Sequence, residues 1–227
     1  MDTVGVVSTR VLIVDDDPLV RSALTLMLGG QQDVEVVGEA RDGHEGLAAV
    51  TDLRPDVVLM DVRMPRLNGL EATRELHLRA DPPRVIVLTT FDADDHVVDA
   101  LAAGADGFLL KDTPPPQILE AIRKVADGEP MLSPSATRTL LRRLRRDHAD
   151  TGAADRVAEA ERRLAPLTYR EREVALAVGR GLSNAEIAAE LYLSVPTVKA
   201  HVSRLFDKLG VTNRVQIAIC VHDAGLV

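Results

Sequence analysis

Five short runs of β-branched and leucine residues recur along the first half of the chain, and they limit its fold more than any other feature. They lie roughly 20 to 30 residues apart, the spacing of repeated strand–helix units. Near-continuous apolar strands with helical crossovers form parallel sheets that are covered on both faces. The runs occupy residues 11–14, 34–37, 57–60, 85–88 and 108–110. We therefore predict an α/β domain over residues 8–127, built on a five-stranded, doubly wound parallel sheet.

The segments between these runs have helix signals at their ends. A proline or a short polar residue stands near most starts, and glycine follows several ends. The helices expected from this pattern cover residues 18–29, 42–50, 70–78, 94–103 and 114–126.

Composition narrows the class of protein. With 46% hydrophobic and 27% charged residues in 227, the chain is typical of a globular protein with room for two domains. A single cysteine, Cys220, excludes an internal disulfide, and we expect it to be buried. No run approaches the roughly 18 to 20 apolar residues of a membrane span, and residues 1–10 lack a secretory pattern. We expect a cytoplasmic protein without a membrane partner.

Charge divides the chain into two parts. Residues 1–130 hold 12 Lys and Arg against 24 Asp and Glu, whereas residues 131–227 hold 15 against 11. Only the second part is suited to a polyanion such as DNA. Its excess of positive charge is small, so we expect a dimer to bind DNA better than a monomer does.

Acidic side chains follow two of the predicted strands. Asp15 and Asp16 come after the first strand and Asp61 ends the third. Since ligands bind at the carboxyl ends of parallel strands, these carboxylates should share one pocket. Ionised carboxylates at close range need a cation, and an all-oxygen set favours Mg²⁺. Thr89 and Lys111 follow two further strands and complete a set suited to phosphoryl transfer.

The second half begins with an irregular segment. We assign residues 128–163 to a linker that holds a helix starting near Ser133–Pro134 and a basic run at residues 142–146. A solvated face explains this run better than contact with nucleic acid. Residues 164–227 form a small all-α domain, in which Thr168 with Glu171 and Ser183 with Glu186 have the capping-box pattern. Helices over 169–179, 184–191 and 195–209 then give helix-turn-helix spacing. A last helix, at 215–222, is expected to serve the core and a dimer.

The first domain resembles the receiver domain of two-component response regulators, which has a flavodoxin-like fold. The matching residues lie at five strand ends, in the segments 14–16, 60–61, 64–69, 89 and 107–111. The resemblance implies that Asp61 accepts a phosphoryl group from a sensor histidine kinase. It also implies that Asp15, Asp16, Asp61 and the backbone carbonyl of Arg63 hold Mg²⁺, while Lys111 and Thr89 contact the phosphoryl oxygens.

Phosphorylation would draw Thr89 inward, and the ring of Phe108 would fill the space that Thr89 leaves. Phe108 stands where the family often has Tyr, so its movement would be transmitted by packing alone. Asp17 and Asp112 also replace residues common in the family, His and Pro respectively, but neither belongs to the core of the mechanism.

The predicted helix 195–209 has one apolar stripe and one polar face. Val198, Val202, Leu205 and Leu209 form the stripe. The opposite side should enter the major groove of DNA. His201 lies near the edge of the stripe, so a base contact and a packed side chain are equally compatible with its position. The candidate DNA contacts are Thr197, Lys199, Ala200, His201, Ser203, Arg204 and Lys208.

The second domain resembles the LuxR-type helix-turn-helix through segments 167–174, 181–188, 197–202, 208–211 and 213–214. Ser203 departs from relatives that carry a basic residue there. Both resemblances together imply a NarL/FixJ-type response regulator: a non-enzymatic transcription factor that dimerises on phosphorylation and binds promoter DNA, with RNA polymerase as a further partner. Two alternatives remain open, namely a receiver that acts only as an unphosphorylated protein-interaction module, and a stand-alone Mg²⁺ phosphatase.

Overall fold

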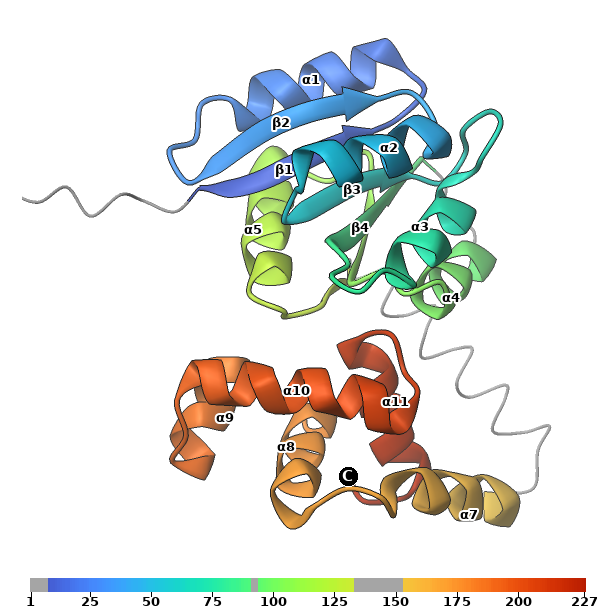
Figure 1. Ribbon diagram of the computed structural model, residues 1–227, viewed down its shortest axis with the longest axis vertical. Helices are drawn as coiled ribbons and strands as arrows, with labels where there is room; N and C mark the ends of the chain where they lie inside the picture. Colours follow the sequence, from blue (N-terminus) through green and yellow to red (C-terminus); the bar gives the residue numbers. More distant parts are fainter. Residues whose placement is uncertain (1–7, 91–93, 133–152) are drawn as a thin grey trace, which may run out of the picture. The chain divides into compact units, whose positions relative to one another are not determined.

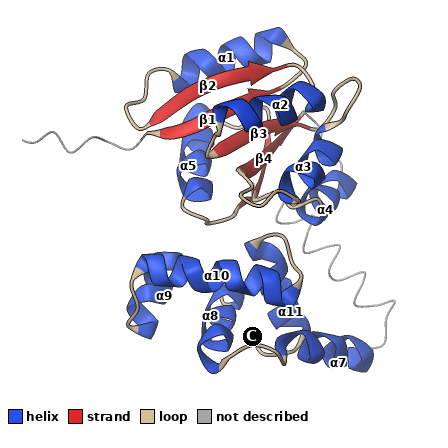
Figure 2. Ribbon diagram, viewed as in Figure 1, coloured by secondary structure: helices blue, strands red, loops and turns tan. Residues whose placement is uncertain are grey.

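The computed structural model describes residues 8–90, 94–132 and 153–227, which fall into two compact units. The first unit alternates strands and helices, and the second is entirely helical in its described part (Figures 1 and 2). The elements of the first unit are β1 (Thr9–Val14), α1 (Pro18–Leu28), β2 (Val34–Ala40), α2 (Gly43–Leu53), β3 (Val57–Asp61), α3 (Gly69–His77), β4 (Arg84–Thr89), α4 (Asp94–Ala102), β5 (Gly107–Leu110), α5 (Pro115–Ala126) and β6 (Met131–Leu132).

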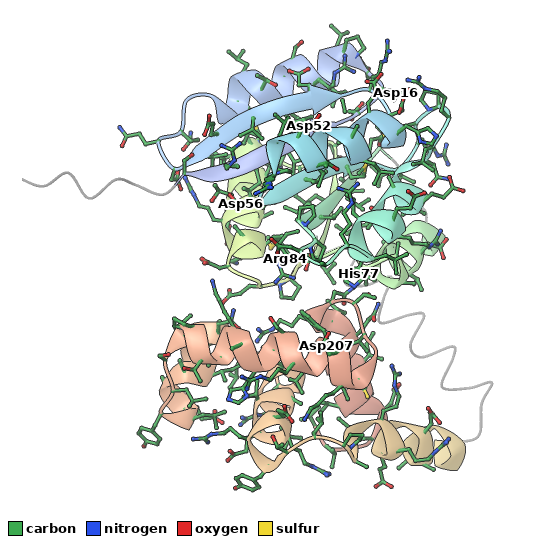
Figure 3. The ribbon with its side chains drawn as sticks, in the orientation of Figure 1. Asp16, Asp52, Asp56, His77, Arg84 and Asp207 are labelled. Atoms are coloured by element: carbon green, nitrogen blue, oxygen red, sulfur yellow. The ribbon has the colours of Figure 1, made fainter. Side chains whose placement is uncertain are left out.

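The strands form one parallel sheet in the order β2-β1-β3-β4-β5-β6. The order reverses direction at β1, which pairs with both β2 and β3. Ligands of doubly wound sheets bind at the carboxyl ends of the strands beside such a reversal. Asp16 marks this end of the sheet in Figure 3, whereas Asp56 and Arg84 lie at the opposite end, where β3 and β4 begin.

Helices cover both faces of the sheet. Helices α1 and α5 pack on one face, where Leu28 and Ile122 are fully buried against strand residues such as Ile13, Leu59 and Ile86. Helices α2, α3 and α4 are neighbours on the other face. The four central strands are buried at nearly every position, as a sheet covered on both faces requires. The predicted doubly wound fold is therefore confirmed.

The sheet has one strand more than predicted. The two-residue strand β6 pairs with β5 at the edge, with Met131 opposite Gly107. Such a short strand carries no periodic signal, so the sequence pattern of five longer runs missed it. Five strands form the core of the sheet, and β6 extends it.

The second unit contains α7 (Ala153–Leu164), α8 (Tyr169–Gly179), α9 (Asn184–Leu191), α10 (Val195–Leu209) and α11 (Arg214–Asp223). Both predicted capping boxes are present, at the starts of α8 and α9. Each supplies hydrogen bonds to backbone amides that have no partner within their helix. Ser194 caps α10 by a single hydrogen bond without the reciprocal half of a capping box, accepting from the Thr197 amide at 3.2 Å. The connection between α9 and α10 is tight because Tyr192 adopts a left-handed conformation, with φ of 53°.

A separate hydrophobic core holds these helices together. The predicted apolar stripe of α10 is buried in it, and so is Cys220 of α11, as expected; the stripe residues are Val198, Val202, Leu205 and Leu209. Helix α7 contributes Ala160 and Leu164.

The segment assigned to a linker, residues 128–163, holds two ordered elements, β6 and most of α7. The helix expected from Ser133–Pro134 and the basic run 142–146 lie outside the described residues. Within the described ranges, none of the helices has both the length and the apolar composition needed to cross a bilayer.

Candidate functional site: an acidic pocket and a DNA-reading helix

Three carboxylates meet at the carboxyl end of the sheet. Asp15 and Asp16 follow β1 and Asp61 ends β3, and one oxygen of each lies within 4.8 Å of the others. Asp15 and Asp61 are 2% and 5% exposed, whereas Asp16 is exposed to solvent. The predicted acidic set is thus brought together, with two members buried and one facing outward.

Lys111 supplies the positive charge. Its Nζ lies 2.6 Å from Asp15 Oδ2 and 3.2 Å from Asp61 Oδ1. Burial raises the pKa of Asp61, and the charge of Asp15 raises it further, while Lys111 opposes both. Burial alone would lower the pKa of Lys111, but the hydrogen bond to Asp15 and the charge of Asp61 outweigh it, so this pKa is raised. Lys111 therefore stays protonated between two carboxylates.

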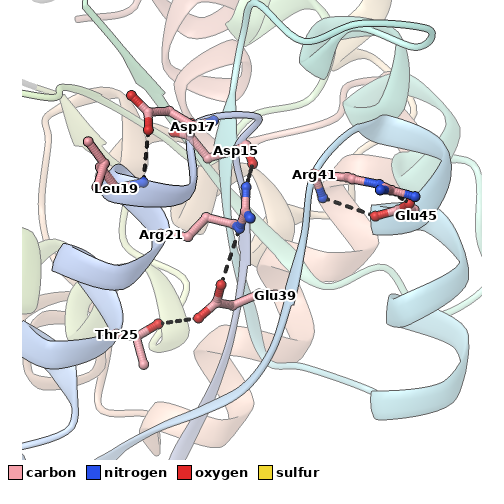
Figure 4. Close-up of polar contacts among 8 residues, drawn as sticks. All are labelled: Asp15, Asp17, Leu19, Arg21, Thr25, Glu39, Arg41 and Glu45. Atoms are coloured by element: carbon pink, nitrogen blue, oxygen red, sulfur yellow. Dashed lines mark hydrogen bonds and ion pairs between the residues drawn. The ribbon is translucent and has the colours of Figure 1, made fainter.

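Polar contacts of Arg21 and Asp17 hold the loop that carries Asp15 (Figure 4). The Arg21 guanidinium donates to the Asp15 carbonyl at 2.7 Å and lies 3.1 Å from Glu39 on β2. Asp17 caps α1 by accepting from the Leu19 amide at 2.8 Å. The Asp17 amide in turn donates to Asp15 Oδ1 at 3.0 Å. Asp17 therefore has a structural role here, and Arg21 is a supporting residue that the sequence analysis did not identify.

Thr89 and Phe108, the predicted switch residues, are both buried. Thr89 is 2% exposed at the end of β4, and its carbonyl accepts from the Lys111 amide at 2.8 Å. This bond ties the ends of β4 and β5 together beside the pocket. The Phe108 ring is fully buried. Its neighbour Leu109 belongs to the core under α1 and α5, so Phe108 points to the other face of the sheet.

The loop after Asp61 folds back against the end of β3. Gly69 begins α3, and a Cβ on this residue would lie 1.8 Å from the Asp61 carbonyl oxygen. Only glycine fits so close to the backbone of β3. The Gly69 amide donates to the Val62 carbonyl at 3.0 Å, which closes the loop. Arg63 lies within this loop, two residues after Asp61, and is exposed.

The charges in the pocket fit a divalent cation. One ammonium group does not offset three carboxylates within 4.8 Å of one another. The donor atoms are all oxygens. Mg²⁺ prefers such a set, whereas zinc and copper favour sets with nitrogen or sulfur ligands. The exposed carboxylate of Asp16 leaves one side open for water and for a phosphate oxygen.

Helix α10 presents a polar side opposite its buried stripe. Ala200, Ser203, Arg204 and Lys208 are exposed there, while Thr197, Lys199 and His201 are half-buried along the sides. Asp207 is also exposed on this side and is labelled in Figure 3. No hydrogen bond or ion pair engages the Arg204 guanidinium in the described parts of the chain. The small side chains near it would permit close approach to a groove.

Several candidate DNA contacts have partners within the domain. Lys208 Nζ lies 2.7 Å from Glu171 Oε2, and the Thr197 hydroxyl is 2.7 Å from the Ser194 hydroxyl. The Ser203 hydroxyl donates to the Lys199 carbonyl one turn earlier, at 3.2 Å. For His201, Nδ1 is buried without a hydrogen-bond partner in the described structure, which fits the packed side chain better than a base contact.

Comparison with known proteins agrees with this architecture. Residues 11–123 match the response regulator receiver domain, and residues 165–221 match the luxR family of bacterial regulatory proteins. The transcriptional regulatory protein LiaR of Bacillus subtilis is 39% identical over 218 residues, covering 96% of this chain and 99% of LiaR. The nitrate/nitrite response regulator NarL of Escherichia coli is 36% identical over 212 residues, covering 93% and 94%.

A solved structure matches over nearly the whole chain as well. The response regulator ChrA of a heme-sensing two-component system has 33% identity and a TM-score of 0.52, covering 97% of this chain and 100% of ChrA. The chain belongs to the response regulators that join a receiver domain to a LuxR-type DNA-binding domain, and it is a two-component transcription regulator of the NarL type.

Proposed function

We propose that Asp61 is the phosphoacceptor of this regulator and that its phosphorylation controls DNA binding by α10. The observation that carries the proposal is the cluster of Asp15, Asp16, Asp61 and Lys111, which lies on the same chain as a LuxR-type helix-turn-helix. The donor is the phosphohistidine of a sensor kinase. We place the receiver at residues 8–127, the connecting region at 128–163 and the DNA-binding domain at 164–227.

The chemical step is a displacement at phosphorus. An Asp61 carboxylate oxygen attacks the phosphoryl group, the bond between phosphorus and the histidine nitrogen breaks, and the imidazole leaves with the electron pair of that bond and takes a proton. The product is an acyl phosphate. Positioning and charge neutralisation supply most of the catalysis in such transfers. Lys111 would pair with the phosphoryl oxygens, and the distance of 3.2 Å between its ammonium group and Asp61 supports this role.

Mg²⁺ would be held by Asp15, Asp16, Asp61 and the carbonyl of Arg63. When bound, it would offset the carboxylate charges and those of the incoming phosphoryl oxygens. The protein itself fixes the position of the Asp15 carboxylate, since Arg21 and the cap of α1 hold the loop that carries it. We assign no separate enzymatic turnover to the chain beyond its own phosphorylation and dephosphorylation.

The phosphoryl group would change the packing beside the pocket. It adds about −1.5 to −2 charge and three acceptor oxygens, which can attract the Thr89 hydroxyl. Thr89 and Phe108 are both buried beside the neighbouring strand ends, so movement of the threonine changes the space available to the ring. Phe108 lacks a hydroxyl group, and the signal is therefore transmitted by packing.

The output is DNA binding by a dimer. Arg204 and Ala200 on the exposed side of α10 would face the major groove, with Lys199 at its edge. Dimerisation roughly doubles the number of phosphate contacts and so strengthens a domain whose net charge is only modestly positive. Promoter DNA, the sensor kinase and RNA polymerase are the partners, and the cytoplasm is the compartment where they meet.

Intact-mass spectrometry after treatment with acetyl phosphate tests the first part. We expect one phosphoryl group on the wild-type chain with Mg²⁺, none with EDTA and none on Asp61→Asn.

Selection of bound duplexes from a random pool tests DNA binding by α10, and Arg204→Gln should weaken binding to the selected sequence. A wild-type chain that resists all phosphodonors while it still binds DNA would favour a receiver that acts only as an interaction module.

A further inference from the structure

A basic side chain holds the loop after Asp61 against helix α2. The Arg66 guanidinium forms an ion pair with Asp42 Oδ2 and lies 3.5 Å from Glu45 Oε1. The Asp42 side chain is fully buried, whereas that of Arg66 is 53% exposed. Asp42 is also the N-cap of α2, since its Oδ1 accepts from the Glu45 amide at 3.0 Å. Arg66 therefore reaches from the loop to the first turn of α2, where Figure 4 shows Glu45 paired with Arg41.

A backbone hydrogen bond also joins the loop to the start of α2, one residue further along each segment. The Gly43 amide donates to the Leu67 carbonyl at 3.1 Å. A Cβ on Gly43 would lie 2.8 Å from that carbonyl oxygen and 2.9 Å from the Leu67 side chain. The loop and α2 are thus in direct contact at Leu67, and the ion pair of Arg66 is adjacent to this contact.

Arg66 has an unfavourable backbone conformation. Its φ is 67°, in the left-handed region that favours glycine. Strain at a non-glycine residue persists where surrounding contacts over-determine it. Beside the Gly43–Leu67 hydrogen bond, the contact at this residue is the ion pair with Asp42. Asp42 Oδ2 is buried and has no hydrogen-bond partner in the described structure, so the charge of Arg66 is what offsets it, and loss of Arg66 would leave a buried, uncompensated carboxylate.

We propose that Arg66 is a positioning residue for the phosphoacceptor loop. Its contact with Asp42 fixes the loop between Val62 and Gly69, and with it the carbonyl of Arg63 that would face the cation. The inference rests on the proposed function, because it concerns the cation that assists phosphorylation of Asp61. Loss of the contact lowers affinity for Mg²⁺ and leaves the chemical step at saturating Mg²⁺ nearly unchanged.

Calorimetric titration of the unphosphorylated full chain with MgCl₂ tests the proposal, alongside the rate of labelling by acetyl phosphate at increasing Mg²⁺. In Arg66→Gly, we expect the Mg²⁺ dissociation constant, and the Mg²⁺ concentration that gives half-maximal labelling, to rise about tenfold, the low end of the effect of losing a residue that supports metal ligands. The maximal labelling rate should stay within about twofold, since the reacting groups are intact. Arg66→Lys, which keeps the charge, should restore part of the affinity.

The matched control is Arg41→Ala. Arg41 pairs with Glu45 at 2.6 Å beside the same first turn of α2, and among the described residues it has no hydrogen bond or ion pair with the loop, so its loss should leave Mg²⁺ binding unchanged. In an Asp42→Asn background, Arg66→Gly should add little, because the two residues act through one contact. Arg66→Gln serves as the neutral variant where glycine prevents folding.

The outcomes separate the two proposals. Failure of the wild-type chain to bind Mg²⁺ or to be labelled would overturn the proposed function itself. A labelled wild type whose Arg66 variants bind Mg²⁺ equally well, with only a lower unfolding temperature, would overturn the positioning role and leave the phosphoacceptor assignment intact.

Discussion

Replacement of Glu171 by Gln should weaken the DNA-binding domain in a pH-dependent way. The Glu171 carboxylate accepts from the amide and the hydroxyl of Thr168 at 2.8 Å each, and it lies 2.7 Å from the ammonium group of Lys208. One buried carboxylate thus connects the start of α8 to the last turn of α10. The bond to Lys208, followed by the Thr168 amide, lowers the pKa of Glu171 from 4.5 to about 2. Glutamine preserves the capping box and removes the charge.

The size of the effect follows from that pKa. A lowering from 4.5 to about 2 corresponds to between about 3 and 4 kcal/mol of stability at most. The Lys208 side chain is 36% exposed, so solvent screens the pair. Allowing for that screening, we expect a loss of about 1 to 2 kcal/mol at neutral pH. The contribution is complete above pH 4.5 and disappears as the pH falls toward 2, because the folded form binds the proton less readily than the unfolded form.

Urea unfolding at pH 7 and pH 3.5 measures this effect. The chain has two tyrosines, Tyr169 and Tyr192, and no tryptophan, so tyrosine fluorescence follows the helical domain alone. Glu173→Gln is the control, because Glu173 pairs with Arg170 on the surface of the same helix and should contribute under about 1 kcal/mol. An equal loss for Glu171→Gln at both pH values, or no loss at pH 7, would show that the ionised Glu171 carboxylate does not stabilise the domain.

Two further predictions concern the two sites. Arg204→Gln should reduce the slope of log affinity against log salt concentration by about one. Lys208→Gln should leave the slope nearly unchanged, because Glu171 already neutralises that lysine. Fluorescence anisotropy with a labelled duplex measures both slopes, and equal slopes for the two variants would argue against Arg204 as a phosphate contact. Asp61→Asn should raise the unfolding temperature of the receiver in EDTA, since burial disfavours the ionised carboxylate in the folded state. Calorimetry should show this gain at neutral pH and its decline as acid protonates Asp61; a destabilised variant would contradict the direction of the pKa shift.

The periodic parts of the fold could be predicted from sequence. Strands such as β3 are continuous apolar runs ended by a polar residue, and helices such as α8 and α9 have caps whose side chains act locally. The edge strand β6 could not be predicted, because two residues carry no period and depend on the neighbouring β5. The same holds for α7, whose burial of Ala160 and Leu164 depends on helices that come later in the chain.

The candidate site also has features that the sequence predicts and features that it does not. The grouping of Asp15, Asp16, Asp61 and Lys111 follows from strand order, since every strand of a parallel sheet ends at one edge. Long-range partners of single side chains do not follow from such rules. The pairing of Lys208 with Glu171 bridges 37 positions of the sequence, so no sequence pattern indicated that this candidate DNA contact also has a partner within the domain.

The ion pair of Arg66 with Asp42 is a similar case. Arg66 stands in a turn, where an arginine usually indicates a solvated surface, and Asp42 was assigned only to the start of a helix. The left-handed φ of Arg66 and the complete burial of Asp42 become evident only in three dimensions. Sequence patterns therefore predicted which acidic residues and which lysine lie together, and the structure added the contact between Arg66 and Asp42.

Control of DNA binding by phospho-Asp61 can be measured as the affinity of the full chain for a selected duplex, before and after treatment with acetyl phosphate and Mg²⁺. Phosphorylated wild-type protein should bind at least about tenfold more tightly, as doubled phosphate contacts in a dimer would allow. Asp61→Asn, treated identically, should keep the affinity of the untreated protein. Equal affinities for fully phosphorylated and untreated wild type, or the same gain in Asp61→Asn, would show that phosphorylation of Asp61 does not control DNA binding.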